Sequence, residues 1–220
     1  MTRSSLWSIL PVLAGASACL GGEPSPAGSS TTTDDWKLAS KKGGVMLYSR
    51  VRPGSSLKEF KAVGDIDAPT RAVHNVIDDF EEYPKFMPFT VECRLVKREG
   101  DAMIGYQRLS PKIVSDRDYT LRIRKKSWPG EGGVIYADQW EPANELGPAE
   151  KPGVLRVKLC EGGWLLEPAG ANKTRATYSV YTDSGGTLPA FIANAAREIG
   201  IRKIFTAVRK QVKNPKYTTN

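Results

Sequence analysis

Residue types that usually carry acid–base or metal chemistry are scarce in this sequence of 220 residues. The single histidine, His74, makes a histidine-built metal site nearly impossible, so we predict no bound metal. His74 lies one position outside the helical stripe Val73, Val76 and Ile77, which favours a surface position over a catalytic one. The run 116–118 (Asp-Arg-Asp) has the residue types of an acid–base cluster, but at a strand entrance a structural salt bridge is favoured.

Motifs for covalent, nucleotide or redox chemistry are missing as well. The sequence has no glycine-rich phosphate loop, no Ser/His/Asp order and no Cys-x-x-Cys pair. A hydrophobic fraction of 40% and a charged fraction of 25% are ordinary for a folded globular chain. We therefore expect a binding protein rather than an enzyme, with no cofactor. The net charge of +8 favours an anionic partner surface.

The first 33 residues are typical of an export signal followed by a linker. Residues 1–18 contain the basic Arg3 and then an apolar run that is too short to span a bilayer. Small residues follow this run and directly precede Cys19. This arrangement resembles the bacterial lipobox, whose cysteine carries lipid, although alanine replaces the usual leucine. Residues 19–33, rich in glycine, serine and threonine, predict a flexible linker. We expect a lipoprotein anchored at Cys19 and facing the periplasm, with secretion or an uncleaved anchor as alternatives.

Two cysteines remain once Cys19 is assigned to lipid. Cys93 and Cys160 each fall inside a predicted strand. Export permits a disulfide between them, and two buried free thiols are the favoured alternative.

Residues 34–220 are expected to form one domain that is rich in strands. Helices are predicted at 67–80 and 188–212, where apolar residues recur at intervals of three and four, and a short helix at 34–38. Strands are predicted at 45–51, 58–64, 91–97, 102–109, 119–125, 134–140, 154–160 with 164–166, and 175–182.

Alternation within the strands predicts an antiparallel sheet with one solvated face. Tyr119, Leu121 and Ile123 share one face of their strand, whereas Thr120, Arg122 and Arg124 share the other. The strand at 154–160 alternates in the same way, with Arg156 and Lys158 expected in solvent.

The last helix carries two apolar stripes that change face at Gly200. Either the helix bends there and its halves cover different surfaces, or it is buried on two sides. A curved sheet around such a helix would enclose a container. The first stripe is Leu188, Ile192, Ala195, Ala196 and Ile199, and the second is Ile201, Ile204, Val208 and Val212.

The same helix is strongly basic, with seven basic residues and one acid between Arg197 and Lys216. A solvated face and a docking surface for an anionic membrane are both consistent with this charge. Nucleic acid is poorly compatible with export, so we expect no nucleic-acid partner.

Three stretches of the sequence resemble the START lipid-transfer family of the helix-grip superfamily. They are 114–119 (VSDRDY), 162–168 (GGWLLEP) and 182–189 (TDSGGTLP), within a resemblance that spans residues 34–212. The resemblance implies an α+β helix-grip fold, in which a curved antiparallel sheet wraps around the long C-terminal helix. It also implies an internal apolar tunnel, roofed by that helix and by the loop 141–153.

The implied function is to bind one hydrophobic ligand, a lipid, in this tunnel and to carry it between membranes as a monomer. The alternatives are an enzyme similar to polyketide cyclases and aromatases, and a store or sensor of a lipid or pigment that does not transfer it. The candidate ligand-binding residues are Ile104, Tyr106, Tyr119, Leu121, Ile123, Trp140, Leu188, Ile192, Ala195, Ala196 and Ile199.

One departure from the family pattern bears on the ligand. Sterol-carrying members place an arginine six residues after the arginine of the Arg-Asp-aromatic motif and pair it with an acid on the previous strand. The same offset here gives Ile123, with its strand neighbour near Ile104. A tunnel without this ion pair would prefer a wholly apolar or differently headed lipid over a sterol. A shift of one residue would instead bring Arg122 or Arg124 to the position.

Overall fold

The computed structural model describes residues 35–55, 57–111, 114–183 and 190–218, and for 190–193 it describes the backbone alone. The expectations for residues 1–18, for Cys19 and the linker 19–33, and for Leu188 lie outside these ranges. From Asp35 onward the described chain forms one compact unit.

The described strands form one antiparallel sheet with a short parallel addition. Their order is β1-β2-β3-β10-β9-β7-β6-β5-β4, which leaves β1 and β4 as open edges, and β8 pairs parallel with β6. The strands are β1 (Lys37–Lys42), β2 (Val45–Val51), β3 (Lys58–Ile66), β4 (Thr90–Glu99), β5 (Ala102–Leu109), β6 (Asp116–Gly130), β7 (Gly133–Pro142), β8 (Val154–Arg156), β9 (Leu159–Pro168) and β10 (Thr174–Asp183).

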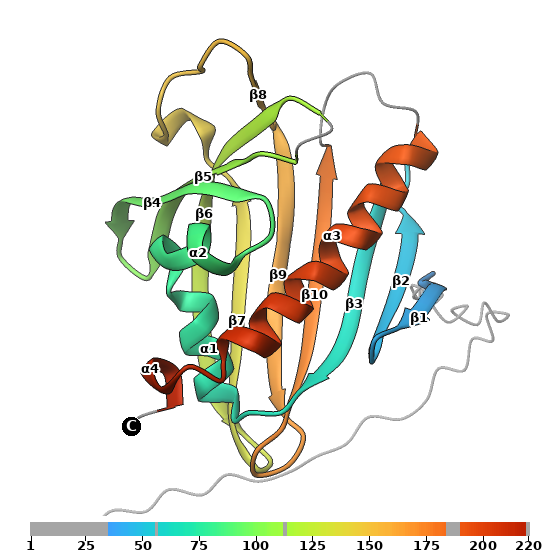
Figure 1. Ribbon diagram of the computed structural model, residues 1–220, viewed down its shortest axis with the longest axis vertical. Helices are drawn as coiled ribbons and strands as arrows, with labels where there is room; N and C mark the ends of the chain where they lie inside the picture. The colour runs from blue at the N-terminus through green and yellow to red at the C-terminus, as the bar shows by residue number, and fades with distance from the viewer. Residues whose placement is uncertain (1–34, 56, 112–113, 184–189, 219–220) are drawn as a thin grey trace, which may run out of the picture. The chain divides into compact units, whose positions relative to one another are not determined.

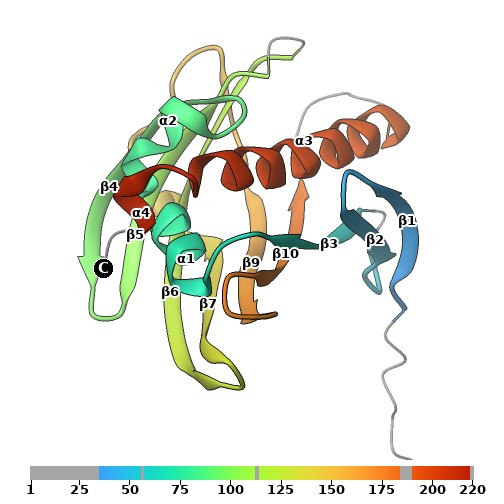
Figure 2. The same ribbon diagram turned by 60° about the horizontal axis from the view of Figure 1, so that its bottom comes forward.

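One long helix lies against this sheet. Figure 1 shows α3 crossing one face of the sheet diagonally, and Figure 2 shows the sheet curving around it. This arrangement confirms the predicted α+β helix-grip fold. The helices are α1 (Thr70–Asp78), η1 (Phe80–Glu82), α2 (Tyr83–Phe86), η2 (Asn144–Leu146), α3 (Ala190–Gln211) and α4 (Pro215–Thr218).

The second half of α3 is fixed to the sheet by apolar packing and by two arginines. Phe205 and Val208 are fully buried, and the ring of Phe205 lies 5.5 Å from that of Trp164. Arg209 donates hydrogen bonds to the carbonyl oxygens of residues 43, 44 and 65, and Arg202 donates to those of residues 42 and 45. These two basic residues therefore stabilise the fold by satisfying carbonyls at the β1–β2 hairpin and near the end of β3.

Two local predictions are wrong. The short helix predicted at 34–38 is replaced by β1, because Lys37 to Lys42 pair with β2, a partner that local propensity does not register. The strand predicted at 154–160 is divided into β8 and β9. The division follows from Arg156, whose side chain turns inward to the buried Asp118 instead of facing solvent.

Candidate functional site

A cavity of about 270 Å³ lies between the sheet and the inner face of α3. Its wall is mostly apolar and comes from β4 to β7, β9, β10, α3, the segment 77–89 and Val157, which lies between β8 and β9. This volume lies near the lower end of the range for small-molecule sites, and the lining has their usual apolar character. The apolar side chains of the wall include Phe80, Met87, Met103, Leu121, Ile123, Trp140, Trp164, Ile201 and Ile204.

Strand β6 supplies the centre of the wall. Tyr119, Leu121 and Ile123 line the cavity, and Trp140 lies beside Ile123 as its partner on β7. The Tyr119 hydroxyl donates to Gln107 Oε1 (3.1 Å), and burial raises the pKa of Tyr119 well above its usual range. These four predicted positions are therefore together in one wall, and their role in ligand binding stays a prediction.

Strand β5 presents the face opposite to the one expected. Met103 and Gln107 line the cavity, whereas Ile104 and Tyr106 are fully buried on the other face. The partner of Ile123 on β5 is Met103 rather than Ile104. Both faces of β5 are buried, so the alternation of residue types along this strand does not indicate which face lines the cavity. The ion pair of the sterol-carrying pattern is still missing at this point, since Met103 and Ile123 are both apolar.

Helix α3 also turns the second of its two stripes inward. Arg197, Gly200, Ile201 and Ile204 line the cavity at helical spacing. Of the first stripe, Ala195, Ala196 and Ile199 are exposed, the last with 54% of its surface accessible, so their predicted place in the wall is corrected. The side chain of Ile192 lies outside the described residues. Because α3 continues from Ala190 to Gln211, Gly200 marks the change of face without interrupting the helix.

Four charged side chains interrupt the apolar wall: Arg117, Lys125, Asp138 and Arg197. Burial lowers the pKa of Arg117, of Lys125 and of Arg197, because removal from water disfavours the charged form. Sequence reasoning missed Lys125 and Asp138. A signal was present, because the alternation that places Ile123 and Trp140 inside also places Lys125 and Asp138 there.

The loop 143–153 is fastened to the outer face of the sheet and does not roof the cavity. Asn144 Oδ1 accepts from Thr120 N (2.8 Å), and Asn144 Nδ2 donates to Val157 O (2.8 Å). Gly147 packs so closely on Thr120 that a Cβ at this position would overlap its hydroxyl. No residue of this fully described loop lines the cavity, so the predicted roof is corrected.

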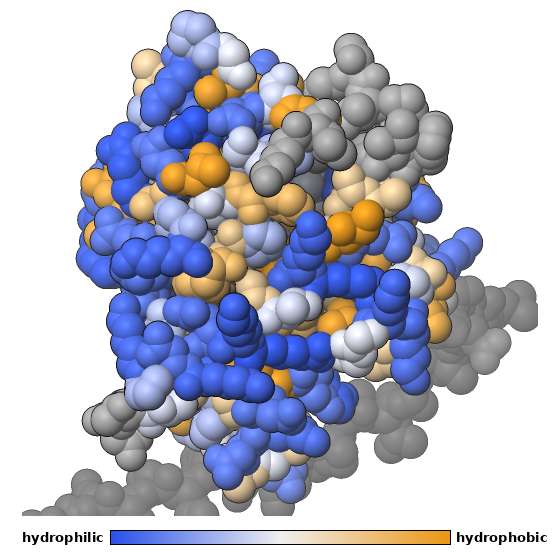
Figure 3. Space-filling model, viewed as in Figure 1, coloured by the Kyte–Doolittle hydropathy of each residue, from blue (hydrophilic) through white to orange (hydrophobic). Residues whose placement is uncertain are grey.

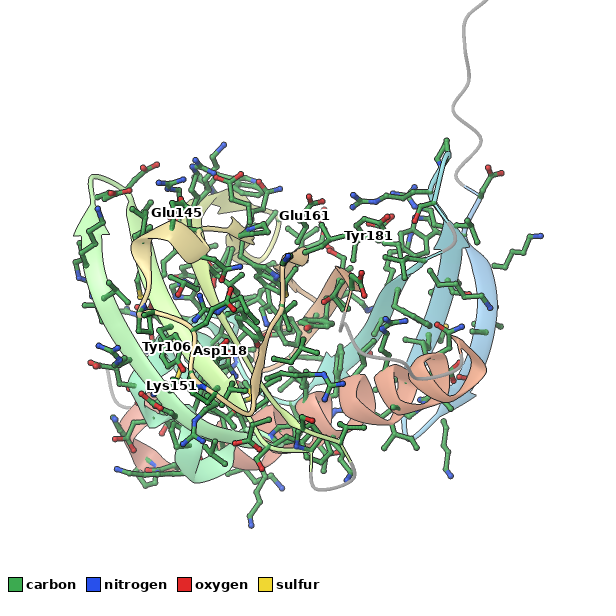
Figure 4. The ribbon with its side chains drawn as sticks, turned by 90° about the horizontal axis from the view of Figure 1, so that it is seen from above. Tyr106, Asp118, Glu145, Lys151, Glu161 and Tyr181 are labelled. Atoms are coloured by element: carbon green, nitrogen blue, oxygen red, sulfur yellow. The ribbon has the colours of Figure 1, made fainter. Side chains whose placement is uncertain are left out.

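A buried ion pair holds the same loop, because Arg156 Nη2 donates a hydrogen bond to Pro148 O (3.0 Å). Arg156 Nε lies 2.7 Å from Asp118 Oδ1, and the two side chains are 7% and 1% exposed. Tyr106 donates to Asp118 Oδ2 (3.0 Å), and burial together with this hydrogen bond raises the pKa of Tyr106 to about 12 (Figure 4). Asp116 pairs with Arg108 at 2.9 Å. Both carboxylates of the 116–118 run thus take part in salt bridges, as the structural interpretation predicts.

The position of Trp140 depends on a glycine on the neighbouring strand. Gly162 is the cross-strand partner of Trp140, and a Cβ on Gly162 would lie 2.7 Å from Trp140 Cζ2 and would overlap Ser179 O. We expect Gly162→Ala to lower the free energy of unfolding by about 3 kcal/mol, because backbone on one side and a packed indole on the other must both move.

Urea denaturation measures this effect, with Gly200→Ala as the matched control. A Cβ at Gly200 meets nothing within 4 Å, so alanine in this helix should stabilise the protein by up to about 1 kcal/mol. Equal stability of Gly162→Ala and the unmutated protein would contradict the close packing of Trp140.

His74 is neither exposed nor part of the wall. Its ring stacks on Tyr136 at 4.2 Å, its side chain is 16% exposed, and Nε2 lies 3.7 Å from Asp138 Oδ1. The predicted surface position is therefore corrected, because β7 covers the helix face that carries His74.

Both remaining cysteines are buried free thiols, the favoured alternative. Cys160 lines the cavity, and burial raises its pKa to about 12. Burial likewise raises the pKa of Cys93 above its usual range. Neither thiol is therefore an activated nucleophile at neutral pH.

Within the described residues, no group of three or more His, Cys, Asp or Glu side chains could hold a metal ion. In the same part of the chain, no helix combines the length and the apolar character that a membrane span requires.

Comparison with known proteins gives both a family match and individual relatives. Residues 66–209 match the family described as polyketide cyclase / dehydrase and lipid transport. An uncharacterized protein of Pseudomonas aeruginosa is 32% identical over 163 residues, which are 74% of this chain and 79% of that protein. The phosphatidylcholine transfer protein of Mus musculus is 24% identical over 212 residues, 92% of this chain and 98% of that protein.

Solved structures show the same fold. The STAR-related lipid transfer protein of Xanthomonas axonopodis has a TM-score of 0.71 and 25% identity, covering 82% of this chain and all of that one. The Zhui aromatase/cyclase of Streptomyces has a TM-score of 0.51 and 15% identity, covering 70% of this chain and 93% of that one. The second match is a likeness of fold alone.

Proposed function

This chain belongs to the polyketide cyclase, dehydrase and lipid transport family, and we propose that it is a lipid carrier. It binds one hydrophobic molecule in the cavity and moves it between membranes as a monomer. The observation that carries the proposal is the cavity itself, a space of about 270 Å³ with a mostly apolar wall between the sheet and α3. An apolar wall binds by removing apolar ligand surface from water.

The relatives support a lipid as the ligand. The phosphatidylcholine transfer protein is similar along nearly its whole length, and the Xanthomonas protein is described as a lipid transfer protein.

Incubation of the full-length protein with a total lipid extract of its source organism tests the proposal. After the protein is isolated again, mass spectrometry should find one lipid per protein molecule. Protein recovered without lipid would contradict the carrier function.

A polyketide cyclase-like enzyme is the second candidate, because Lys125 and Asp138 are titratable groups in the cavity wall. Such groups can take and return protons beside a bound substrate. Incubation with a reactive poly-β-ketone distinguishes the two candidates: an enzyme releases a cyclised, dehydrated product over many turnovers, and a carrier does not.

The outer face of α3 is our candidate for the membrane-docking surface. Ala195, Ala196 and Ile199 are exposed on the first half of the helix, and the exposed Lys203 and Lys210 follow on the second half. Figure 3 shows hydrophobic side chains scattered among hydrophilic ones in the middle of this view and mostly hydrophilic side chains in its lower part. Apolar residues followed by lysines suit a bilayer with anionic headgroups. The lipid anchor at Cys19 would hold the domain near a membrane facing the periplasm.

Transfer of a fluorescent lipid between anionic donor and acceptor vesicles measures this docking. We expect Ile199→Asp to slow transfer about tenfold, because it removes an inserting apolar side chain and adds a negative charge. Leu38→Asp is the matched control, since Leu38 is 58% exposed on β1, and it should leave the rate unchanged. Equal rates for both variants would exclude this face of α3, and an absence of transfer in the unmutated protein would favour a store or sensor.

A further inference from the structure

A tyrosine on β10, Tyr178, lines the cavity between two tryptophans of the wall. Its cross-strand partner on β9 is Trp164, and the centres of these two rings lie 4.8 Å apart. The centre of the Trp140 ring lies 5.7 Å from that of Tyr178. Both tryptophans line the same cavity. Two residues of the wall therefore fix the position of the Tyr178 ring.

The hydroxyl of Tyr178 faces the cavity and is unused. Within the described residues it takes part in no hydrogen bond. The side-chain atoms of this part of the chain that are sealed from solvent without a partner do not include the Tyr178 oxygen, so this oxygen keeps accessible surface. Burial, followed by the nearby thiol of Cys160, raises the pKa of Tyr178 above its usual range. An oxygen that is removed from bulk water and is still accessible lies at the surface of the cavity.

The other two tyrosines among the described lining residues already donate to the protein. Tyr83 donates to Ile77 O (2.7 Å), and Tyr119 donates to Gln107 Oε1 (3.1 Å). Besides burial, the hydroxyls of Tyr178 and Tyr83 contribute to the raised pKa of Tyr119, so the three phenol oxygens lie near one another. Of these three hydroxyls, the one on Tyr178 is therefore the one whose proton is still available to a ligand.

The surroundings of this hydroxyl favour an uncharged acceptor. The groups that contact or perturb Tyr178 are two indoles and the Cys160 thiol, whose pKa of about 12 keeps it neutral. An anionic headgroup would lose its water here without a counter-charge from these neighbours. A neutral carbonyl oxygen accepts the phenol proton at a much smaller cost, and a buried donor left without an acceptor is itself destabilising.

We propose that the Tyr178 hydroxyl donates a hydrogen bond to the carbonyl oxygen of a neutral lipid ester or ketone held in the cavity. The proposal rests on the carrier function above and names the class of its ligand. It also assigns a polar anchor to β10, three places from β6 in the order of the sheet and away from the apolar Ile123–Met103 contact.

Displacement of the dye Nile red from the full-length protein by two competitors tests this assignment. Methyl dodecanoate carries an ester carbonyl, and tetradecane has the same number of chain atoms without one. The ratio of the two displacing concentrations is independent of how tightly the dye itself binds. The solubility of each competitor cancels when the same stocks are used for every variant. If neither compound displaces the dye from the unmutated protein, the carrier function is overturned, and this inference with it.

Replacing Tyr178 with phenylalanine removes the hydroxyl and keeps the ring. In Tyr178→Phe the ester should require an about fivefold higher concentration relative to tetradecane, as expected for one neutral hydrogen bond. Tyr181→Phe is the matched control, because Tyr181 points to the other face of β10 and donates to Ser55 Oγ (2.8 Å). It should leave the ratio unchanged. An unchanged ratio in Tyr178→Phe, or an equal loss for both compounds, overturns the assignment.

Infrared spectroscopy of bound methyl dodecanoate with an isotopically labelled carbonyl gives a readout that a loss of packing alone would not change. A carbonyl that accepts a hydrogen bond absorbs at lower frequency than a free one. We expect the lower-frequency band in the unmutated protein and in Tyr181→Phe, and the band of a free carbonyl in Tyr178→Phe. The same band position in Tyr178→Phe and in the unmutated protein would overturn the assignment, whatever the dye measurements give.

Discussion

Replacing Asp118 with alanine should lower the free energy of unfolding by about 3–5 kcal/mol, the largest loss of stability that we expect from a single substitution. The carboxylate accepts two hydrogen bonds from Arg156, at 2.7 and 3.1 Å, and one from Tyr106 at 3.0 Å. All three groups are buried or nearly so. Without Asp118, the Arg156 guanidinium keeps its burial and loses its counter-charge, and desolvation of an unpaired charge is what makes the loss large.

Urea denaturation of this variant and of Glu141→Ala separates the effect of burial on the free energy of unfolding from the effect of losing an ion pair. Arg124 and Glu141 also form an ion pair at 2.8 Å on neighbouring strands, but their side chains are 46% and 44% exposed. Breaking this exposed pair should cost less than about 1 kcal/mol. The double variant Asp118→Leu/Arg156→Met should recover much of the stability lost in Asp118→Ala, because neither charge of this pair remains. Equal effects of Asp118→Ala and Glu141→Ala would mean that burial of the pair has no energetic consequence.

Replacing Gly200 with tryptophan should weaken ligand binding by a hundredfold or more. Gly200 lines the cavity, and the space beyond its Cα is open. An indole there would displace several methylene groups of a ligand. Four lost methylenes at about 0.8 kcal/mol each amount to about 3 kcal/mol, more than a hundredfold in affinity.

Titration with Nile red measures the affinity, and the adjacent residue provides the control. Ile199→Trp introduces the same side chain one position away on the exposed face of α3 and should bind the dye as the unmutated protein does. Gly200→Ala, which removes the glycine without filling the space, should also bind normally. Thermal unfolding of all three variants shows whether the fold is kept. Tight binding by a folded Gly200→Trp would place the ligand outside this cavity.

The sequence by itself determined the class of fold and most of its elements. Strand-type residues bounded by turn residues predicted the strands at 45–51 and 102–109 with the bounds that the structure shows. Alternation of apolar and polar residues predicted correctly that Tyr119, Leu121 and Ile123 face one side of the sheet together. These features are local, because a period of two or of 3.6 depends only on neighbouring residues.

Tertiary structure decided which of two equivalent faces became the inner one. On β5 both faces are apolar, and pairing with β6 placed Met103 inside and Ile104 outside. On α3 the second stripe was turned inward because Phe205 and Val208 pack on the core beneath it, which left Ile199 in solvent.

Long-range partners also decided where the charged residues lie. Arg156 follows an alternation that predicts a solvated side chain, yet it is buried because Asp118 lies on β6, 38 residues earlier. The register between β6 and β7 places Lys125 and Asp138 next to each other on neighbouring strands of the cavity wall. Burial of a charge is costly unless another element supplies its partner, and the position of that element is a property of the folded chain alone.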